Sequence, residues 1–269
     1  MCVYVHLFRS KQTILVDLAC SGKMQPMRSE NANWIIFGSD SEVLMLNLKP
    51  NEEVICESGA MIARGDSIKA TISTGTGGVW SSFSRWMFGG ENILFDSFTN
   101  GSNSDQEIYL CASFPGGKII PIGLDQCTGM IISPGAWLAT KGSDINFDAT
   151  TVKTLYSGLF AGRGFVLPTI SGSSLTFLCG GGTVLSFNLE PRQSIVIDAT
   201  SFLACESSVD IKACPSGSIF MMMFGGESTF QCKLTGPGKV FLQSMPACNI
   251  AKTTAQAARM ATGIKQKTA

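Results

Sequence analysis

Apolar and polar residues alternate strictly along three short stretches of the chain. In each stretch three apolar side chains are separated by single polar residues. The apolar members are Ile68, Ala70 and Ile72, then Ile145, Phe147 and Ala149, then Val209, Ile211 and Ala213. A period of two is typical of a β-strand that turns one face to a core and the other to water. We therefore expect three half-buried strands whose apolar faces are covered.

The same series of shorter apolar runs precedes each alternating stretch. Each series has a run that contains a leucine, then a turn and a β-branched run, then a third apolar run. The leucines are Leu48, Leu124 and Leu189, the β-branched runs are 54–55, 130–132 and 195–197, and the third runs are 61–63, 137–139 and 202–204. This order predicts that the three leucines occupy equivalent, buried positions.

A glycine turn also occurs three times, downstream of the alternating stretches. Its copies are Phe88-Gly89-Gly90-Glu91-Asn92, Phe160-Ala161-Gly162-Arg163-Gly164 and Phe224-Gly225-Gly226-Glu227-Ser228. The first residues are separated by 160 − 88 = 72 and 224 − 160 = 64 positions. A period of this length indicates a small structural unit that is repeated along the chain.

These patterns predict an all-β protein of three tandem β-units. Glycine and proline separate nearly every apolar run, which is typical of sandwiches and barrels of short strands. The expected division is a leader or extension at 1–33, β-repeats at 34–104, 105–172 and 173–245, and a basic tail at 246–269. The glycine turns of the three units are expected to superpose under a roughly threefold rotation.

Charge is low and unevenly distributed. Charged residues make up 15% of the 269 residues, and the net charge is zero. Residues 31–244 hold 12 Lys and Arg against 18 Asp and Glu, a net of −6. Nucleic-acid binding by this acidic body is disfavoured, because such binding depends on Lys and Arg that neutralise phosphates. The basic tail is expected either to fray in water or to form a short helix capped by Asn249.

Nothing in the sequence assembles a catalytic constellation. His6 is the only histidine and lies in the leader, so the body has no histidine for a catalytic dyad or a metal site. The ten cysteines form no C-x-x-C pair, and Cys56, Cys111, Cys179 and Cys232 lie within strand runs, where a thiol acts as a small hydrophobe. Gly75-Thr76-Gly77-Gly78 and Gly238-Lys239 both lack the context of a phosphate loop. No enzyme activity, metal or cofactor is expected.

The leader has two interpretations. It is either a poorly ordered extension or added strand, or a mitochondrial presequence, since basic residues outnumber acids before Glu30. No apolar stretch reaches the roughly 20 residues that a membrane span needs.

Large apolar side chains gather just before the first glycine turn, at Trp80, Phe83, Trp86 and Met87. Methionine and aromatic residues are enriched in cores and at interaction surfaces alike. One interpretation is that they fill contacts between the repeats. The other is that this segment is exposed and docks a partner or a membrane surface.

Several motifs together resemble the altered-inheritance-of-mitochondria family. They are Gly59-Ala60-Met61, the stretch from Ser81 to Glu91, Phe114-Pro115-Gly116 with Ile119 to Ile122, and the stretch from Leu234 to Gln243. The likeness covers about residues 34–245. It implies a TRAP-like fold of three double-stranded β-helix or β-sandwich units in pseudo-threefold order. The yeast branch is implicated in mitochondrial inner-membrane organisation, the bacterial members are a domain of unknown function, and the family has no assigned catalytic residues.

The leading hypothesis is a non-enzymatic structural or interaction protein that acts through oligomeric assembly and partner contacts, in mitochondrial or membrane organisation. The alternative is a small-ligand-binding module with sites between β-units. A homo-oligomer is expected, with a trimer favoured, because ring closure removes exposed sheet edges. The protein partner is not specified by the sequence. A cytoplasmic location is favoured, with a mitochondrial one as the alternative.

One expectation concerns the charged residue of each glycine turn. Glu91, Arg163 and Glu227 are equivalent, so Arg163 would bridge both carboxylates if the turns met near a threefold axis. Arg163→Glu is then expected to weaken assembly or stability by more than about 1 kcal/mol, since three like charges would face one another. If the three are solvated turn residues, the change is nearly silent.

Overall fold

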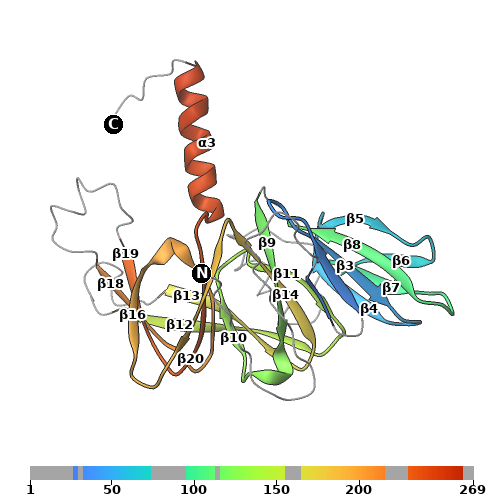
Figure 1. Ribbon diagram of the computed structural model, residues 1–269, viewed down its shortest axis with the longest axis horizontal. Coiled ribbons are helices and arrows are strands. Elements are labelled where there is room, and N and C mark those ends of the chain that lie inside the picture. Colours follow the sequence, from blue (N-terminus) through green and yellow to red (C-terminus); the bar gives the residue numbers. More distant parts are fainter. Residues whose placement is uncertain are drawn as a thin grey trace.

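The computed structural model describes residues 27–29, 33–73, 95–112, 116–154, 165–215 and 230–262. In these residues the chain consists almost entirely of β-strands, with one α-helix near the C-terminal end (Figure 1). The prediction of an all-β protein is therefore confirmed.

The strands form three sheets, in each of which every strand pairs with the next one named. The five-stranded sheet is β1 (Met27–Arg28), β2 (Trp34–Phe37), β3 (Val43–Leu48), β8 (Gln106–Cys111) and β5 (Met61–Arg64). The six-stranded sheet is β6 (Ile68–Ser73), β7 (Phe95–Asn100), β4 (Glu53–Glu57), β11 (Trp137–Lys141), β14 (Leu175–Gly181) and β9 (Gly117–Gly123). The nine-stranded sheet is β15 (Val184–Leu189), β20 (Gly238–Gln243), β17 (Phe202–Glu206), β10 (Met130–Ile132), β13 (Phe165–Gly172), β12 (Ile145–Thr154), β18 (Asp210–Pro215), β19 (Phe230–Thr235) and β16 (Ser194–Asp198). Two 3-10 turns, η1 (Leu124–Gln126) and η2 (Ala199–Ser201), connect strands.

Two trios of strands occur three times in the sheets, once for each of the three series of apolar runs in the sequence. The trio β3-β8-β5 is matched by β9-β14-β11 and by β15-β20-β17. The trio β4-β7-β6 is matched by β10-β13-β12 and by β16-β19-β18. A register shift interrupts the pairing at the same point of β5, β11 and β17, between Met61 and Ala63, Trp137 and Ala139, and Phe202 and Ala204. The unit boundaries and the threefold rotation stay predictions.

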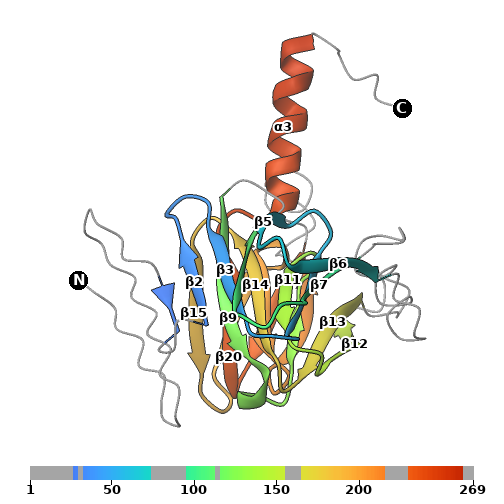
Figure 2. The same cartoon turned by 90° about the vertical axis from the view of Figure 1, so that its right-hand side faces the viewer.

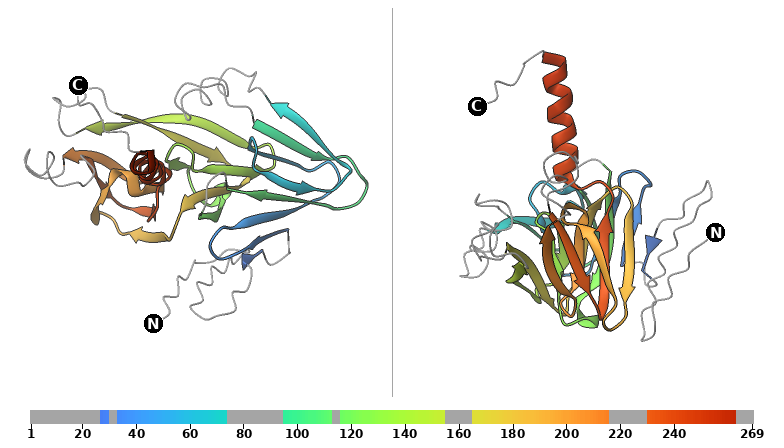
Figure 3. Two further views of the ribbon diagram at one scale, coloured as in Figure 1. Left: turned by 90° about the horizontal axis from the view of Figure 1, so that it is seen from above. Right: turned by 90° about the vertical axis from the view of Figure 1, so that its left-hand side faces the viewer.

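Two further pairings join these trios into the larger sheets. β11 pairs antiparallel with β4, and β17 pairs antiparallel with β10. We call these two pairings the internal joints. Strands β3, β4 and β5 lie at one end of the longest axis of the molecule, and β16, β18 and β19 lie at the other (Figures 1 and 3).

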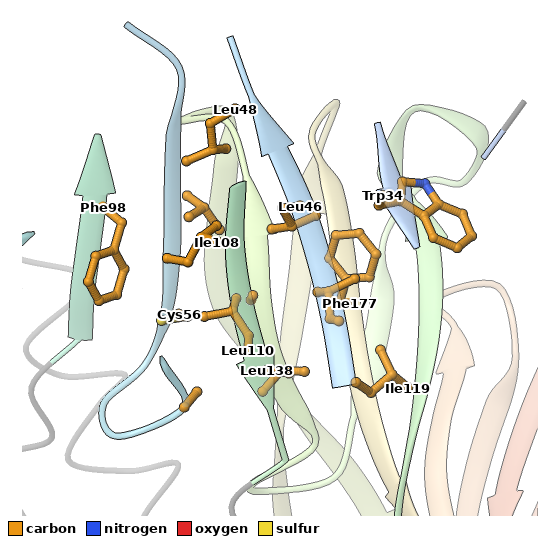
Figure 4. Packing of buried hydrophobic residues seen from close by; sticks show 14 of the residues in the cluster. Trp34, Leu46, Leu48, Cys56, Phe98, Ile108, Leu110, Ile119, Leu138 and Phe177 are labelled. Atoms are coloured by element: carbon orange, nitrogen blue, oxygen red, sulfur yellow. The ribbon is translucent and has the colours of Figure 1, made fainter. Parts of the chain in front are cut away.

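Three clusters of buried apolar side chains form the core. The first two clusters each cross an internal joint. Leu138 of β11 and Cys56 of β4 belong to the first cluster (Figure 4), and Leu203 of β17 and Ile132 of β10 belong to the second. The core therefore continues from one set of strands into the next.

Trp137 lies in the second cluster and is fully buried. Its ring makes edge-to-face contacts with Phe95 and Phe147, with centroid distances of 5.3 and 5.5 Å. Its indole Nε1 donates a hydrogen bond to Thr140 Oγ1 at 2.9 Å, and that hydroxyl is 2.8 Å from Thr176 Oγ1. Aromatic pairs of this geometry contribute about 0.5–1.5 kcal/mol beyond the burial of their area. The indole is thus satisfied both by packing and by a hydrogen bond.

The three equivalent leucines are buried, as the sequence predicts. Leu48 and Leu124 are 0% exposed, and Leu189 is 2% exposed. Two of them precede tight turns of the same kind, in which Pro50 and Pro191 are followed by residues with φ of 63° and 69°. Proline followed by a residue with positive φ is the pattern of a type II turn.

The predicted alternation of burial is confirmed in two strands and wrong in the third. Ile145 and Phe147 are buried at the start of β12, and Ile211 and Ala213 are buried in β18, as is Val209 just before it. In β6 only Ile68 is buried. Ala70 is exposed and Ile72 is 66% exposed. The physical reason is that an apolar face is buried only where other side chains pack against it, and the first core cluster includes Ile68 at the start of β6 but not Ala70 or Ile72.

The basic tail forms helix α3 (Ala247–Thr262), which projects away from the sheets (Figures 1 and 2). The helical alternative is thus the one observed, but the predicted cap is wrong. The carbonyl of Pro246 accepts hydrogen bonds from the N–H groups of Asn249 at 2.9 Å and Ile250 at 3.3 Å. Asn249 therefore lies inside the first turn, because the proline supplies the first acceptor carbonyl of the helix.

Replacement of Thr140 by valine is expected to lower the free energy of unfolding by about 1–3 kcal/mol, because the buried Trp137 N–H loses its acceptor. Denaturant unfolding followed by tryptophan fluorescence measures the change. Thr140→Ser keeps the hydroxyl and is the matched control, with a smaller expected loss. Equal losses in the two variants would show that the hydrogen bond contributes nothing measurable.

Candidate interaction surface

None of the seven residues that the sequence assigns to a site belongs to the described residues. They are Trp80, Phe83, Trp86, Met87, Glu91, Arg163 and Glu227. The docking-segment hypothesis and the charge-cluster hypothesis therefore stay predictions. Within the described residues, other side chains form the candidate surface.

Exposed large apolar side chains gather on the edge strands of the three sheets. Six of the nine such side chains in the described residues lie on β5, β6, β15 or β16, each of which is the last strand of its sheet. They are Met61, Ile62, Ile72, Leu185, Phe187 and Val196. An edge strand also presents unpaired backbone N–H and C=O groups, so an apolar edge is suited to receiving a strand from a partner.

The outer edge at β15 differs from the corresponding edges at β3 and β9. β2 pairs with the outer side of β3. The residue before β3 covers β9, since the N–H of Ile119 donates to the Glu42 carboxylate at 2.7 Å and the N–H of Glu42 donates to the Gly117 carbonyl at 3.0 Å. On β15, Leu185 is 50% exposed and Phe187 is 37% exposed. Within the described part of the chain, no strand pairs with the outer side of β15.

A second open edge is β5, which is exposed along its whole length. The strands in the same place of the other trios, β11 and β17, are buried except for their last residues. At the second residue of the strand, Ile62 is 53% exposed while Leu138 and Leu203 are 0% exposed. A third open edge is β16, where Val196 is 58% exposed beside the buried Ile197.

Burial holds four cysteines of the sheets, Cys56, Cys179, Cys205 and Cys232, in the neutral thiol form. It raises the pKa of Cys56 and Cys179 to about 12 and that of Cys232 to about 11, with nearby negative charges adding to the effect, and it raises the pKa of Cys205 as well. The thiolate is the nucleophile, so these four side chains are unreactive at neutral pH. The sequence predicts that Cys56, Cys111, Cys179 and Cys232 act as small hydrophobes within strands. Three of them are buried, in agreement with this prediction, whereas Cys111 is only half-buried.

A half-buried lysine lies beside the second internal joint. Lys239 follows Gly238 at the start of β20, and burial lowers the pKa of its ammonium group while the charge of Glu206 opposes that shift. Cys127 is a further neighbour, and burial raises the pKa of its thiol. In the sequence, Gly238-Lys239 is noted only as an incomplete phosphate loop. The burial of Lys239 beside a carboxylate is missed, because such burial leaves no pattern in the sequence. A partly desolvated cation of this kind is suited to an anionic ligand.

In the ranges that the structure describes, no group of three or more His, Cys, Asp or Glu side chains is arranged to hold a metal ion. No helix in those ranges is long and apolar enough to cross a membrane. His6 lies outside them. The described surface thus offers strand edges and the partly buried Lys239.

Comparison with known proteins agrees with the resemblance seen in the sequence. The family model described as mitochondrial biogenesis AIM24 matches residues 34–245. No curated protein was found to match. In structure the chain is similar to protein SPYM3_0169 from Streptococcus pyogenes, with a TM-score of 0.62 and 18% identity over 83% of this chain and 98% of that one, a likeness of fold alone. Because the family match covers well over half of the sequence, the chain belongs to the mitochondrial biogenesis AIM24 family.

Proposed function

We propose that this chain is a non-enzymatic structural or interaction protein that acts through oligomeric assembly and partner contacts. The observation that carries the proposal is the position of six of the nine exposed large apolar side chains, among the described residues, on edge strands. Edges that face water usually avoid such side chains, because they invite pairing with another chain. The family description supports a place for this activity in mitochondrial or membrane organisation.

The proposal includes three TRAP-like β-units per chain in pseudo-threefold arrangement. Its support is the matching strand order of the trios and the register shift that β5, β11 and β17 share. For location we propose the cytoplasm, with mitochondria as the alternative that the family description favours.

The proposal assigns no catalysis to the sheets. Its support is the chemistry of three buried cysteines, Cys56, Cys179 and Cys232, whose raised pKa keeps their thiols neutral. Raised pKa values are the reverse of what activates a catalytic thiol.

The second candidate is a small-ligand-binding module with sites between β-units. Lys239 favours it, because this partly buried cation lies on β20 beside the joint between β17 and β10. A thermal-shift screen with anionic metabolites tests it, since a ligand that binds only the folded state raises its stability. Lys239→Gln is the matched variant. A shift that persists in that variant would place the ligand elsewhere.

An aromatic disulfide reagent at pH 8 is expected to leave Cys56, Cys179, Cys205 and Cys232 unmodified in the folded protein and to label them only on unfolding. The reason is that burial blocks both access and ionisation of these thiols. Peptide mass spectrometry locates the label, and the half-buried Cys111 provides a comparison in the same sample. Rapid labelling of any of the four would reveal an activated thiol and argue for catalysis.

Light scattering of the full chain at micromolar concentrations is expected to give the mass of several chains, with a trimer favoured. The physical reason is that open apolar edges are removed from water when copies pair. A mass of one chain at every concentration would contradict the assembly part of the proposal. Partner contacts would then have to come from other proteins.

A further inference from the structure

The two internal joints are built in the same register. In the first joint Ala139 of β11 lies opposite Cys56 of β4, and in the second Ala204 of β17 lies opposite Ile132 of β10. Both alanines directly follow the register shift of their strands. The chain thus makes the same contact twice, with different side chains.

The same hydrogen bond extends each joint beyond its strands. The N–H of Gly142 donates to the Glu53 carbonyl at 2.9 Å in the first joint, and the N–H of Ser207 donates to the Gly129 carbonyl at 2.9 Å in the second. Each donor lies three residues after the alanine, and each acceptor lies three residues before the partner of that alanine. A joint is therefore a defined structure with one half from each strand.

Strand β5 has the form of one half of a joint but takes part in none. It carries the same register shift as β11 and β17, here between Met61 and Ala63. In the described part of the chain β8 is its one neighbour. Its side chain Ile62 is 53% exposed, whereas Leu138 and Leu203 are 0% exposed and lie in core clusters that cross their joints.

Strand β16 has the form of the other half. It takes the place in its trio that β4 and β10 take in theirs, and among the described strands it pairs with β19 alone. Val196 is 58% exposed, whereas Ile131, in the corresponding position of β10, is 4% exposed and lies in the third core cluster. Each chain therefore carries both halves of a third joint.

The two halves cannot meet within one copy, because β5 and β16 lie at opposite ends of the longest axis (Figures 1 and 3). We propose that β5 of one copy pairs antiparallel with β16 of a second copy, in the register of the internal joints. This inference rests on the proposed function, since it names the surface through which the assembly forms.

The internal joints fix the expected pairing in detail. Ala63 would lie opposite Ile197, and Arg64 opposite Val196. The N–H of Asp66 would donate to the carbonyl of Ser194, as the corresponding donors do in both internal joints. Ile62 would then be buried, as Leu138 and Leu203 are.

Such an interface is head-to-tail, because the two surfaces that meet are different. Each added copy leaves one β5 and one β16 open, so assembly continues until a ring closes. A trimeric ring is the closed form that the sequence favours. Blocking either half on its own should stop growth, and the two kinds of blocked chain should complement each other.

The test uses three full-length variants and light scattering. Ile62→Glu places a charge on β5, Val196→Glu places one on β16, and Ile72→Glu is the control on another edge strand, where the side chain is 66% exposed. All three replace exposed side chains, and circular dichroism and thermal melting check that each variant folds. We expect the first two variants to have the mass of one chain and the control to assemble like the unmodified protein. A 1:1 mixture of the first two should form a dimer, because one intact β5 meets one intact β16.

The outcomes separate this inference from the proposed function. If the unmodified protein is a monomer, this inference and the assembly part of the proposed function both fail, and contacts with other proteins are left. If it assembles and neither blocked variant changes its mass, assembly stands and the β5–β16 interface is overturned. If only one of the two variants is a monomer, the head-to-tail pairing is overturned in favour of a symmetric contact of that strand with its copy. If both variants and their mixture are monomers, the head-to-tail pairing is overturned as well.

Hydrogen exchange of the unmodified protein gives a second, independent measurement. The amides of 61–66 and 194–198 should exchange several-fold more slowly in the assembly than in the diluted protein, while those of β6 should not change. Equal exchange of 61–66 and 194–198 in the two states would overturn the pairing even if a variant fails to fold.

Discussion

The architecture depends on backbone pairing across the two internal joints. A strand at the end of a trio has N–H and C=O groups that must bond to another strand or to water. The backbone groups of β11 bond to β4, and those of β17 bond to β10. The trios thereby merge into sheets of six and nine strands. A core cluster crosses each joint, in which Leu138 and Leu203 are fully buried, and full burial of a leucine side chain is worth about 1.5–3 kcal/mol. One contact therefore supplies both hydrogen bonds and apolar burial, so losing the pairing would remove both.

The aromatic contacts of Trp137 reinforce the first joint from inside the core. Phe95 comes from β7 and Phe147 from β12, so the indole ring lies between strands that belong to different trios. Its N–H bonds to Thr140 on its own strand, and that hydroxyl reaches Thr176 on β14. A buried polar chain of this kind is stable only when every member has a partner. The position of β11 between β4 and β14 is thus specified by side chains as well as by the backbone.

The sequence predicts the type of each element, which its periodicity reflects, but it does not predict burial that depends on which other element packs against it. The all-β class, the equivalent leucines and the burial of Cys56 follow from local patterns, since an alternating or apolar run is the same wherever its sheet lies. The exposure of Ala70 and Ile72 does not follow from the pattern, because an apolar face is covered only if another element lies against it. The apolar runs at 61–63 and 137–139 are similar in sequence, yet the first is exposed and the second is buried. The sequence of the run alone therefore does not decide its burial. The predicted helix cap at Asn249 is wrong for a similar reason at short range. The carbonyl of Pro246 accepts the first hydrogen bonds of the helix, so the helix begins before Asn249.

The charges near the open edges indicate why β5 and β16 differ from protected edges. Proteins commonly guard a free edge with lysine, proline or a covering loop. β9 has Lys118, Pro121 and the Glu42 contact. The only charged residue of β5 is Arg64, whose guanidinium donates to the Ile68 carbonyl on its own chain. The only charged residue of β16 is Asp198, whose carboxylate accepts bonds from the N–H and hydroxyl of Thr200 at 2.7 and 2.6 Å. Both charges are held by local partners, so neither strand presents a free charge that would repel an incoming strand.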